Sequence, residues 1–468
     1  MPEQLETAPS SGSALTDRPR LPPRTVVLGN PERYVALTLE DLCRHTMIFG
    51  NSGSGKTTRA FNPMLLQILG RLDAGGFIIA AKTEAACEAA EIATRAGREF
   101  LIITPGSSTG LDLLTGNPDV DSMFLRDAFG RVNEDSKHWV DAAVTRCKNA
   151  LRILEAAGPQ YYTFEALTSY IFDESFASDT RIYVNEKLRQ LPFESDEAWT
   201  IREAMAYEEK RYKNFTPETR QAIQFAVSQL LEPLQDVQIA KTFARKRNLV
   251  SIDAVFAGKV IILHVPRSRY ERAAQAIYTL AKRRFFTAVE NRRTNPLLNQ
   301  ARPVVFGVDE YQLCISESDV QSLGTIRSAG CMVLGSTQGV SSLYSVLPRN
   351  QVDAALQNFT HKIFFKTDDE ATLELLGRAH RDTISKSDTE TLLAMNRNQA
   401  LCHLTAQDET TDEVLTMQPL FIDTAAEDLA RITPAPPPEA TIPPAQPKLG
   451  IPTYETPGVD DRQDDLVR

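Results

Sequence analysis

The glycine-rich segment at residues 50–57, Gly-Asn-Ser-Gly-Ser-Gly-Lys-Thr, restricts the fold of this chain more than any other feature. It follows a short apolar run, residues 45–49, and precedes residues 57–69, which have helical spacing. In a strand–loop–helix unit of this kind, glycines let successive backbone N–H groups turn toward a phosphate, and the positive end of the helix faces the same anion. The pattern predicts a nucleotide site made of Gly50, Asn51, Ser52, Gly53, Ser54, Gly55, Lys56, Thr57 and Thr58. The alternative is a glycine-rich turn before an ordinary helix.

The last two residues of this loop have predicted chemical roles. Lys56 would reach the β- and γ-phosphates, and the Thr57 hydroxyl would ligate Mg²⁺. A second apolar run, residues 303–308, ends in Asp309 and Glu310. We expect Asp309 to hold the Mg²⁺ through water and Glu310 to polarise the attacking water, an arrangement that favours hydrolysis. A solvated turn after a strand is the alternative interpretation of this acidic pair.

Two further residues follow the acidic pair. Gln338 comes at the end of an apolar run that begins at residue 331, and we expect it to sense the γ-phosphate beside the acidic strand. Arg327 ends the preceding helical segment and is a candidate arginine finger, delivered across a subunit interface. An ordinary surface arginine is the alternative for Arg327.

Strand and helix patterns alternate through most of the chain. Apolar runs at 45–49, 76–80, 99–103, 259–265, 303–308, 331–335 and 362–365 predict strands, and helical spacing at 84–96 and 271–293 predicts helices. This rhythm indicates βαβ units and a mainly parallel sheet. Strand signals fade between residues 119 and 246, where 138–156, 164–175, 196–213 and 217–232 have helical spacing. The predicted fold class is therefore α/β, interrupted by an all-helical domain.

The ends of the chain have a different composition. Residues 1–24 are rich in Ser, Pro and Thr, and residues 432–468 hold nine prolines followed by an acidic stretch. Such segments bury too little apolar surface to order themselves, so both are predicted to be disordered. The tail is either a solvated segment or a docking site for a partner. The predicted division is 1–24, 25–118 (first part of the core), 119–246 (helical insertion), 247–431 (second part of the core) and 432–468.

The net charge of −10 does not attract nucleic acid to the surface as a whole, so any such site must be local. The first candidates are Lys241, Arg245, Lys246 and Arg247, where the insertion rejoins the core. Two other basic runs are Lys210, Arg211 and Lys213, and Lys282, Arg283 and Arg284. For each run the alternative is a solvated helix face.

Cysteine and hydropathy patterns exclude several classes of protein. The six cysteines have no metal-ligand or redox spacing, which favours buried, reduced thiols. No apolar run approaches the ~18–20 residues that cross a bilayer, and the polar N-terminus is unlike a signal peptide. A cytoplasmic protein is expected.

The ordered set of motifs resembles the type IV secretion coupling proteins, which are ATPases of the FtsK/HerA type. The segments that carry the resemblance are 45–58, 82–84, 305–311, 326–330 with 335–338, 357–367 and 372–377. It covers roughly residues 40–410, with the helical insertion where the family has its all-alpha domain. Two features depart from the family: Ala80 and Ala81 replace an Asp-Pro pair, and the family's usual N-terminal membrane helices are missing.

The resemblance implies a RecA-like P-loop core and a hexameric motor that uses ATP and Mg²⁺ to move DNA without sequence specificity. It also implies a membrane or secretion-channel subunit as partner, which would hold the protein at the inner membrane, and a relaxosome or effector protein bound through the tail. One alternative is a coupling ATPase that recruits protein substrates without DNA. Another is a nucleotide-gated scaffold, which the intact Lys56, Thr57, Asp309 and Glu310 disfavour.

Overall fold

The computed structural model describes residues 24–129, 134–245, 248–296, 298, 301–379, 390 and 392–422. The predicted disordered tail and residues 1–23 of the predicted disordered start lie outside this part of the chain, as do Lys246 and Arg247.

Nine strands of the described residues form one sheet, in the order β13-β12-β11-β3-β10-β9-β4-β8-β5. Its parallel strands are β3 (Thr46–Phe49), β4 (Gly75–Ala80), β5 (Phe100–Ile103), β8 (Val260–His264), β9 (Val304–Val308), β10 (Cys331–Thr337) and β11 (His361–Phe364). Every strand that the apolar runs predict is among them. The predicted α/β fold with a mainly parallel sheet is therefore confirmed.

The sheet ends in an antiparallel hairpin that the sequence analysis did not predict. Its strands are β12 (Gln399–Ala406) and β13 (Glu409–Thr416), and β12 pairs with β11. Gln407 and Asp408, the two residues of the turn, both have positive φ angles, 49° and 67°. Such turns usually carry glycine, and its absence here removes the usual hairpin signal.

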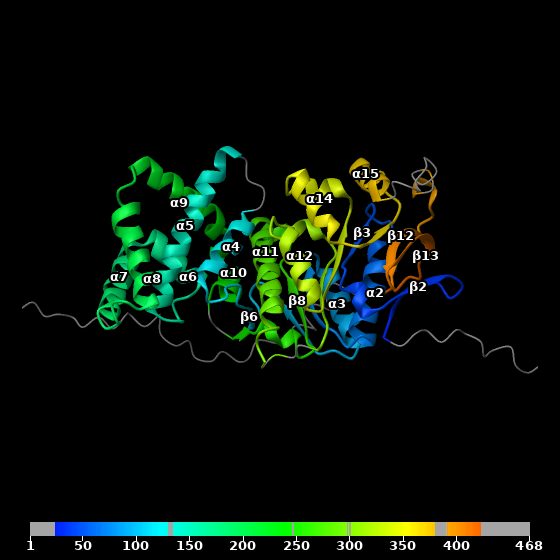
Figure 1. The fold of residues 1–468 in the computed structure, drawn as a ribbon, viewed down its shortest axis with the longest axis horizontal. Helices are drawn as coiled ribbons and strands as arrows, with labels where there is room; N and C mark the ends of the chain where they lie inside the picture. The colour runs from blue at the N-terminus through cyan, green and yellow to red at the C-terminus, as the bar shows by residue number, and fades with distance from the viewer. Residues whose placement is uncertain are drawn as a thin grey trace, which may run out of the picture.

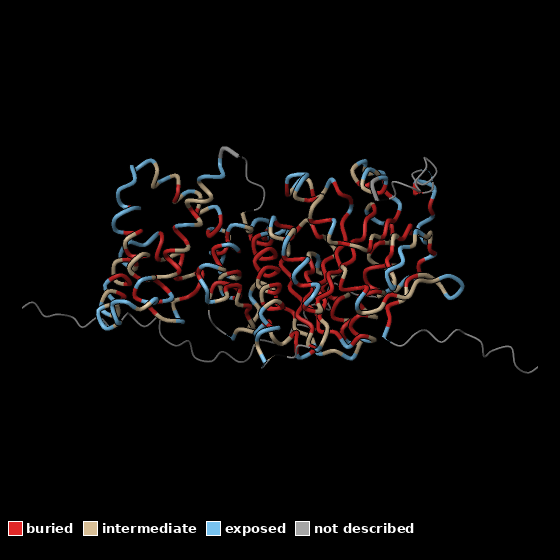
Figure 2. The backbone as a smooth tube through the Cα atoms, in the orientation of Figure 1, coloured by how far each residue is buried: buried red, intermediate tan, exposed pale blue. Residues whose placement is uncertain are grey.

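Helices cover both faces of the sheet. Successive side chains of a strand point to opposite faces, so Ile78 packs with α2 (Asn62–Arg71) and α3 (Thr83–Arg95) on one side. Phe77 points the other way and stacks on Phe285 of α11 (Arg267–Asn291), with ring centroids 5.2 Å apart. Figure 2 shows the central strands buried between these layers. The continuous apolar runs of the sequence follow from this burial on both faces.

The other elements of the core are short. They are β1 (Val26–Gly29), β2 (Tyr34–Leu37), α1 (Leu39–Leu42), β6 (Gly110–Leu111), β7 (Leu249–Val250), α12 (Asp319–Ser328), α13 (Val340–Tyr344), α14 (Arg349–Gln357) and α15 (Glu370–Ala379).

The helical insertion lies at one end of the molecule, beside α11 (Figure 1). Its helices are α4 (Pro118–Ala128), α5 (Glu134–Ala157), α6 (Phe164–Phe172), α7 (Glu174–Leu188), α8 (Asp196–Ala206), the π-helical turn η2 (Tyr207–Tyr212), α9 (Pro217–Leu231) and α10 (Val237–Ile239). The inserted all-helical domain is thus observed as predicted. The sequence analysis did not identify α4 and α7.

One predicted basic run has a structural role instead. Lys282 is fully buried, where it pairs with Asp319 and donates to Ser316 Oγ at 2.9 Å. Arg283 is also buried, and its Nε lies 3.0 Å from Asp127 Oδ2 of α4. The interpretation of these two residues as a nucleic-acid contact is wrong, because both face the core and are neutralised there.

Other sequence expectations concern the cysteines, membrane spans and metal clusters. All six cysteines are buried, as predicted. No helix of the described residues combines the length and apolarity needed to span a membrane. These residues also contain no cluster of three or more histidine, cysteine or carboxylate side chains placed to hold a metal ion.

Two buried histidines connect the strands at one end of the sheet. His45 precedes β3, and its Nδ1 accepts the backbone N–H of Val333 at 3.2 Å. His361 begins β11, and its Nδ1 accepts the backbone N–H of Thr405 at 3.3 Å. Each Nε2 lies within 2.9 Å of a carbonyl oxygen, to which it donates. Burial lowers the pKa of both imidazoles to about 4.

We expect this pair to make the protein less stable in weak acid. The unfolded chain binds protons near the ordinary histidine pKa of 6.5, whereas the folded protein keeps both imidazoles neutral down to about pH 4. The free energy of unfolding therefore keeps its full value above pH 6.5 and falls as the pH drops toward about 4. The shift corresponds to about 3 kcal/mol for each histidine. Urea unfolding near neutral pH and near pH 5 measures the loss. His361→Gln should lower this pH dependence, and an unchanged dependence would contradict the assignment.

Candidate nucleotide site

The phosphate loop connects β3 to the π-helical turn η1 (Thr57–Phe61), which continues into α2. Gly50, Gly53 and Gly55 have φ angles of +151°, +73° and +103°. A Cβ at Gly50 would lie 2.7 Å from both Phe365 Cβ and Ser54 Oγ. Glycine is therefore required at these turns, and the backbone adopts the strand–loop–helix course that the motif predicts.

Lys56 lies buried under the loop. Its Nζ donates to the carbonyl oxygens of Gly50 at 2.6 Å and Asn51 at 3.1 Å. Burial lowers the pKa of Lys56, whereas the negative charges of Asp309 and Glu310 raise it. The ammonium group is thus held at the loop, on the side of the two carboxylates.

The acidic strand comes close to the loop because of the strand order. β10 lies between β3 and β9, with Thr337 opposite Phe49 and Gly335 opposite Val308. The residues that follow β3 and β9 therefore share one edge of the sheet. There Thr57 Oγ1 donates to Asp309 Oδ2 at 2.7 Å, which joins the two predicted metal ligands directly.

The donor set at this point fits Mg²⁺. Asp309 Oδ1 is buried and forms no hydrogen bond with the described residues. Burial raises the pKa of Asp309, and the hydrogen bond from Thr57 lowers it. A hydroxyl and a carboxylate with one unused oxygen are hard ligands of the type that Mg²⁺ prefers.

Glu310 is oriented by two neighbours. Gln312 Nε2 donates to Glu310 Oε2 at 2.7 Å, and Lys82 Nζ lies 3.8 Å from Glu310 Oε1. Thr337 Oγ1 in turn donates to Gln312 Oε1 at 3.1 Å. Gln338 follows Thr337 at the same edge of the sheet and is exposed. The sequence analysis missed Gln312, although its position two residues after Glu310 was a usable signal.

Arg327 lies at the other edge of the sheet. It is exposed at the end of α12, just before β10 begins, whereas Gln338 follows the last residue of that strand. The seven residues of β10 separate the two edges by about 20 Å. Arg327 therefore cannot reach the phosphate loop of its own chain.

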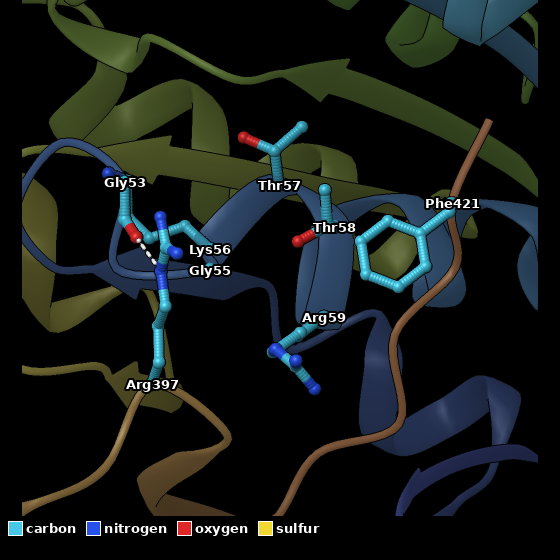
Figure 3. Close-up of a pocket in the computed structure, with 8 residues that line it drawn as sticks. All are labelled: Gly53, Gly55, Lys56, Thr57, Thr58, Arg59, Arg397 and Phe421. Carbon is cyan, nitrogen blue, oxygen red and sulfur yellow. Dashed lines mark hydrogen bonds between the residues drawn. The ribbon is translucent and has the colours of Figure 1, made fainter. Parts of the chain in front are cut away.

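A pocket of about 290 Å³ opens beside the loop, lined by Gly53, Gly55, Lys56, Thr57, Thr58, Arg59, Arg397 and Phe421 (Figure 3). Arg397 Nε donates to the Gly53 carbonyl at 2.8 Å. Arg59 Nη1 donates to the Met417 carbonyl at 2.9 Å, and the Leu420 N–H donates to the Thr58 carbonyl at 2.7 Å. The chain around β12 and β13 thus folds over the loop. No local signal pointed to Arg397 or Phe421, because both are distant in sequence.

The other predicted basic residues that the structure describes lie away from this pocket. Lys241 is exposed where the insertion rejoins the core, but Arg245 Nη2 pairs with Glu165 at 2.8 Å. Lys210, Arg211 and Lys213 are exposed on the helical insertion. The structure does not bring any of them to the nucleotide site.

We expect Arg397→Ala to weaken nucleotide binding about tenfold, because it removes a charged hydrogen bond that fixes the loop at Gly53. Titration of a fluorescent ATP analogue measures the affinity. The matched control is Arg33→Ala, which removes an exposed ion pair with Glu413. Equal affinities in the two variants would show that Arg397 does not support the loop.

Part of this site lies in a segment that matches a known protein family. Residues 303–420 match the family described as the TraM recognition site of TraD and TraG. This segment includes Asp309, Glu310, Arg327, Gln338 and Arg397. A comparison with curated protein sequences found no match.

Solved structures share the fold over most of the chain. The bacterial conjugative coupling protein TrwBdeltaN70 is 15% identical with a TM-score of 0.57, over 84% of this chain and 90% of that one. TrwB in complex with ADP and Mg²⁺ is 14% identical with a TM-score of 0.59, over 83% and 88%. VirB4 of Thermoanaerobacter pseudethanolicus is 15% identical with a TM-score of 0.52, over 86% and 98%. With the family match over residues 303–420, this shared fold confirms the predicted resemblance of the chain to the type IV coupling proteins.

Proposed function

We propose that this protein is an ATP-hydrolysing motor that moves DNA and works as a ring of six subunits. The observation that carries the proposal is the hydrogen bond between Thr57 and Asp309. It supports the proposal because the two proposed metal ligands lie in contact beside the phosphate loop, with Glu310 as the next residue. The TrwB structures include complexes with ADP and Mg²⁺, with a non-hydrolysable ATP analogue and with a non-hydrolysable GTP analogue, which supports a purine nucleotide with Mg²⁺ at this site.

In this proposal each residue of the site has one task. The loop amides bind the phosphates, and Lys56 exchanges the Gly50 and Asn51 carbonyls for phosphate oxygens. Thr57 and Asp309 hold Mg²⁺, which when bound neutralises phosphate charge. Glu310 orients the attacking water, and Gln338 at the same edge senses the γ-phosphate.

In this proposal the chain has two functional parts. Residues 25–118 and 247–431 form the ATPase core, and residues 119–246 form the helical domain. With a net charge of −10, DNA contact depends on local basic residues, of which Lys241 at the domain junction is exposed. The protein would act in the cytoplasm or at the inner membrane through a separate membrane or channel subunit. A relaxosome or effector protein would bind the C-terminal tail.

We expect Glu310→Gln to lower ATP turnover by at least about 100-fold while leaving ATP binding intact, because only the carboxylate can orient and polarise the water. The assay compares steady-state hydrolysis with and without single- and double-stranded DNA. Wild-type turnover should rise when DNA is added. Undiminished turnover in Glu310→Gln would refute the assigned catalytic role, and turnover insensitive to DNA in an assembled ring would refute the DNA cargo.

A separate prediction concerns Arg327 as an arginine finger. Because Arg327 lies at the edge of the sheet away from its own loop, it would serve the site of a neighbouring subunit. Arg327→Ala should therefore lower turnover by about 100-fold or more. Oligomers that mix Arg327→Ala with Lys56→Ala subunits should recover part of the activity, since an intact loop then meets an intact arginine.

The matched control for this experiment is Arg293→Ala. Arg293 is exposed near Arg327 and donates to Ser328 Oγ at 2.8 Å. It should keep wild-type turnover. Mixed oligomers that recover no activity, or an equal loss in Arg293→Ala, would contradict action across the interface.

One observation favours a second candidate function, a coupling ATPase that recruits protein substrates without DNA. The family that matches residues 303–420 is named for recognition of TraM by TraD and TraG. In this alternative the ATPase site is the same and the cargo is a protein. Turnover that responds to a partner protein and not to DNA would favour it.

A further inference from the structure

A second pocket, of about 530 Å³, lies within the helical insertion, apart from the nucleotide site. It is formed by α5, the junction of α6 and α7, the π-helical turn η2 and the first two turns of α9. Its volume is in the range of ordinary small-ligand sites. No residue of the proposed ATPase mechanism lines it.

One buried carboxylate that lines this pocket has an oxygen without a hydrogen-bond partner among the described residues. Glu208 is only 4% exposed, and its Oε1 is buried without a hydrogen-bond partner among the described residues. The π-helical turn is responsible, because it buries Glu208 and Tyr212 and leaves Glu209, Lys210 and Arg211 exposed. Leaving a buried acceptor unpaired is costly, and π-helical turns are frequent at functional sites. Glu208 therefore marks a position where a ligand can supply an N–H donor.

The remaining charges of the pocket favour an anion. Four basic side chains line it against two acidic ones: Arg146, Arg181, Lys213 and Arg220, with Glu174 and Glu208. Arg181 is paired with Glu174 at 2.6 Å. Lys213 is exposed and Arg220 is half-buried, and Arg220 Nη1 donates to the Lys213 carbonyl at 3.2 Å. α9 begins beside them at Pro217, so its positive end adds to their field.

Flat surfaces complete the site. The Arg146 guanidinium lies over the Tyr212 ring, with Cζ 3.8 Å from the ring centroid, and donates to the Tyr212 hydroxyl. Tyr170 and Phe172 also line the pocket, and Phe172 is 43% exposed. Aromatic rings and guanidinium planes are surfaces on which nucleobases stack.

We propose that this pocket binds one nucleotide unit. The base would donate an N–H to Glu208 Oε1 and stack on the aromatic and guanidinium surfaces, and its phosphate would lie between Lys213 and Arg220. The unit can come from a single-stranded DNA or from a free mononucleotide, because both present the same base and phosphate. The proposal rests on the helical insertion alone and does not require the ATPase function.

The test uses the full-length protein with the phosphate loop saturated by a non-hydrolysable ATP analogue. The probes are a short labelled deoxyoligonucleotide, the same oligonucleotide made abasic, and free dGMP. Glu208→Gln keeps the size of the side chain but removes the charge, and should weaken binding about tenfold. Arg220→Gln should weaken binding and reduce its dependence on salt. The matched controls are Glu209→Gln and Arg211→Gln, which change exposed residues of the same turn.

The outcomes separate the two sources of the nucleotide. Binding of the oligonucleotide but not of dGMP assigns the pocket to single-stranded DNA, and binding of dGMP assigns it to a free nucleotide. Both require Glu208→Gln to bind more weakly than Glu209→Gln. Equal binding by these two variants, equal binding of the abasic probe, or binding of an acidic peptide without any nucleotide would overturn the proposal. Arg220→Gln, a change at a half-buried residue, decides the matter if Glu208→Gln does not fold.

Discussion

The hydrogen bond from Thr57 to Asp309 joins the two halves of the chain at the nucleotide site. The strands β3, β10 and β9 are neighbours and all run parallel, so the carboxyl ends of strands from both halves meet at one edge of the sheet. The helical insertion separates these halves in sequence but leaves this edge free.

A buried polar network connects that edge to the helical insertion. Tyr311, which follows the acidic pair, donates to Asp319 Oδ2 at 2.8 Å, and Asp319 pairs with Lys282 of α11. The next residue of α11, Arg283, pairs with Asp127 of α4. Buried charges of this kind are stable only with their partners in place, since removal of one partner leaves the other unpaired in the core. The acidic strand, α11 and the insertion are therefore held in one arrangement.

The positions of Arg327 and the phosphate loop also restrict how copies of the protein can associate. One lies at each edge of the sheet, so an arginine that completes a neighbour's site brings unlike surfaces together, either reciprocally in a two-fold pair or in a head-to-tail contact. Contacts of the head-to-tail type form closed rings when the rotation between subunits closes. The geometry of a single chain thus agrees with the ring that the proposed motor requires.

The sequence by itself determined the local units of this protein. Apolar runs buried on both faces predicted the seven parallel strands, and the glycines at 50, 53 and 55 and the acids at 309 and 310 identified the two halves of the site. These signals are readable because each depends on neighbours in the chain. The tertiary structure alone decided that Lys282 and Arg283 are buried, that Arg397 donates to the Gly53 carbonyl, and that Glu208 Oε1 has no hydrogen-bond partner among the described residues in its pocket. In each case the deciding contacts come from segments distant in sequence, so local periodicity does not predict them.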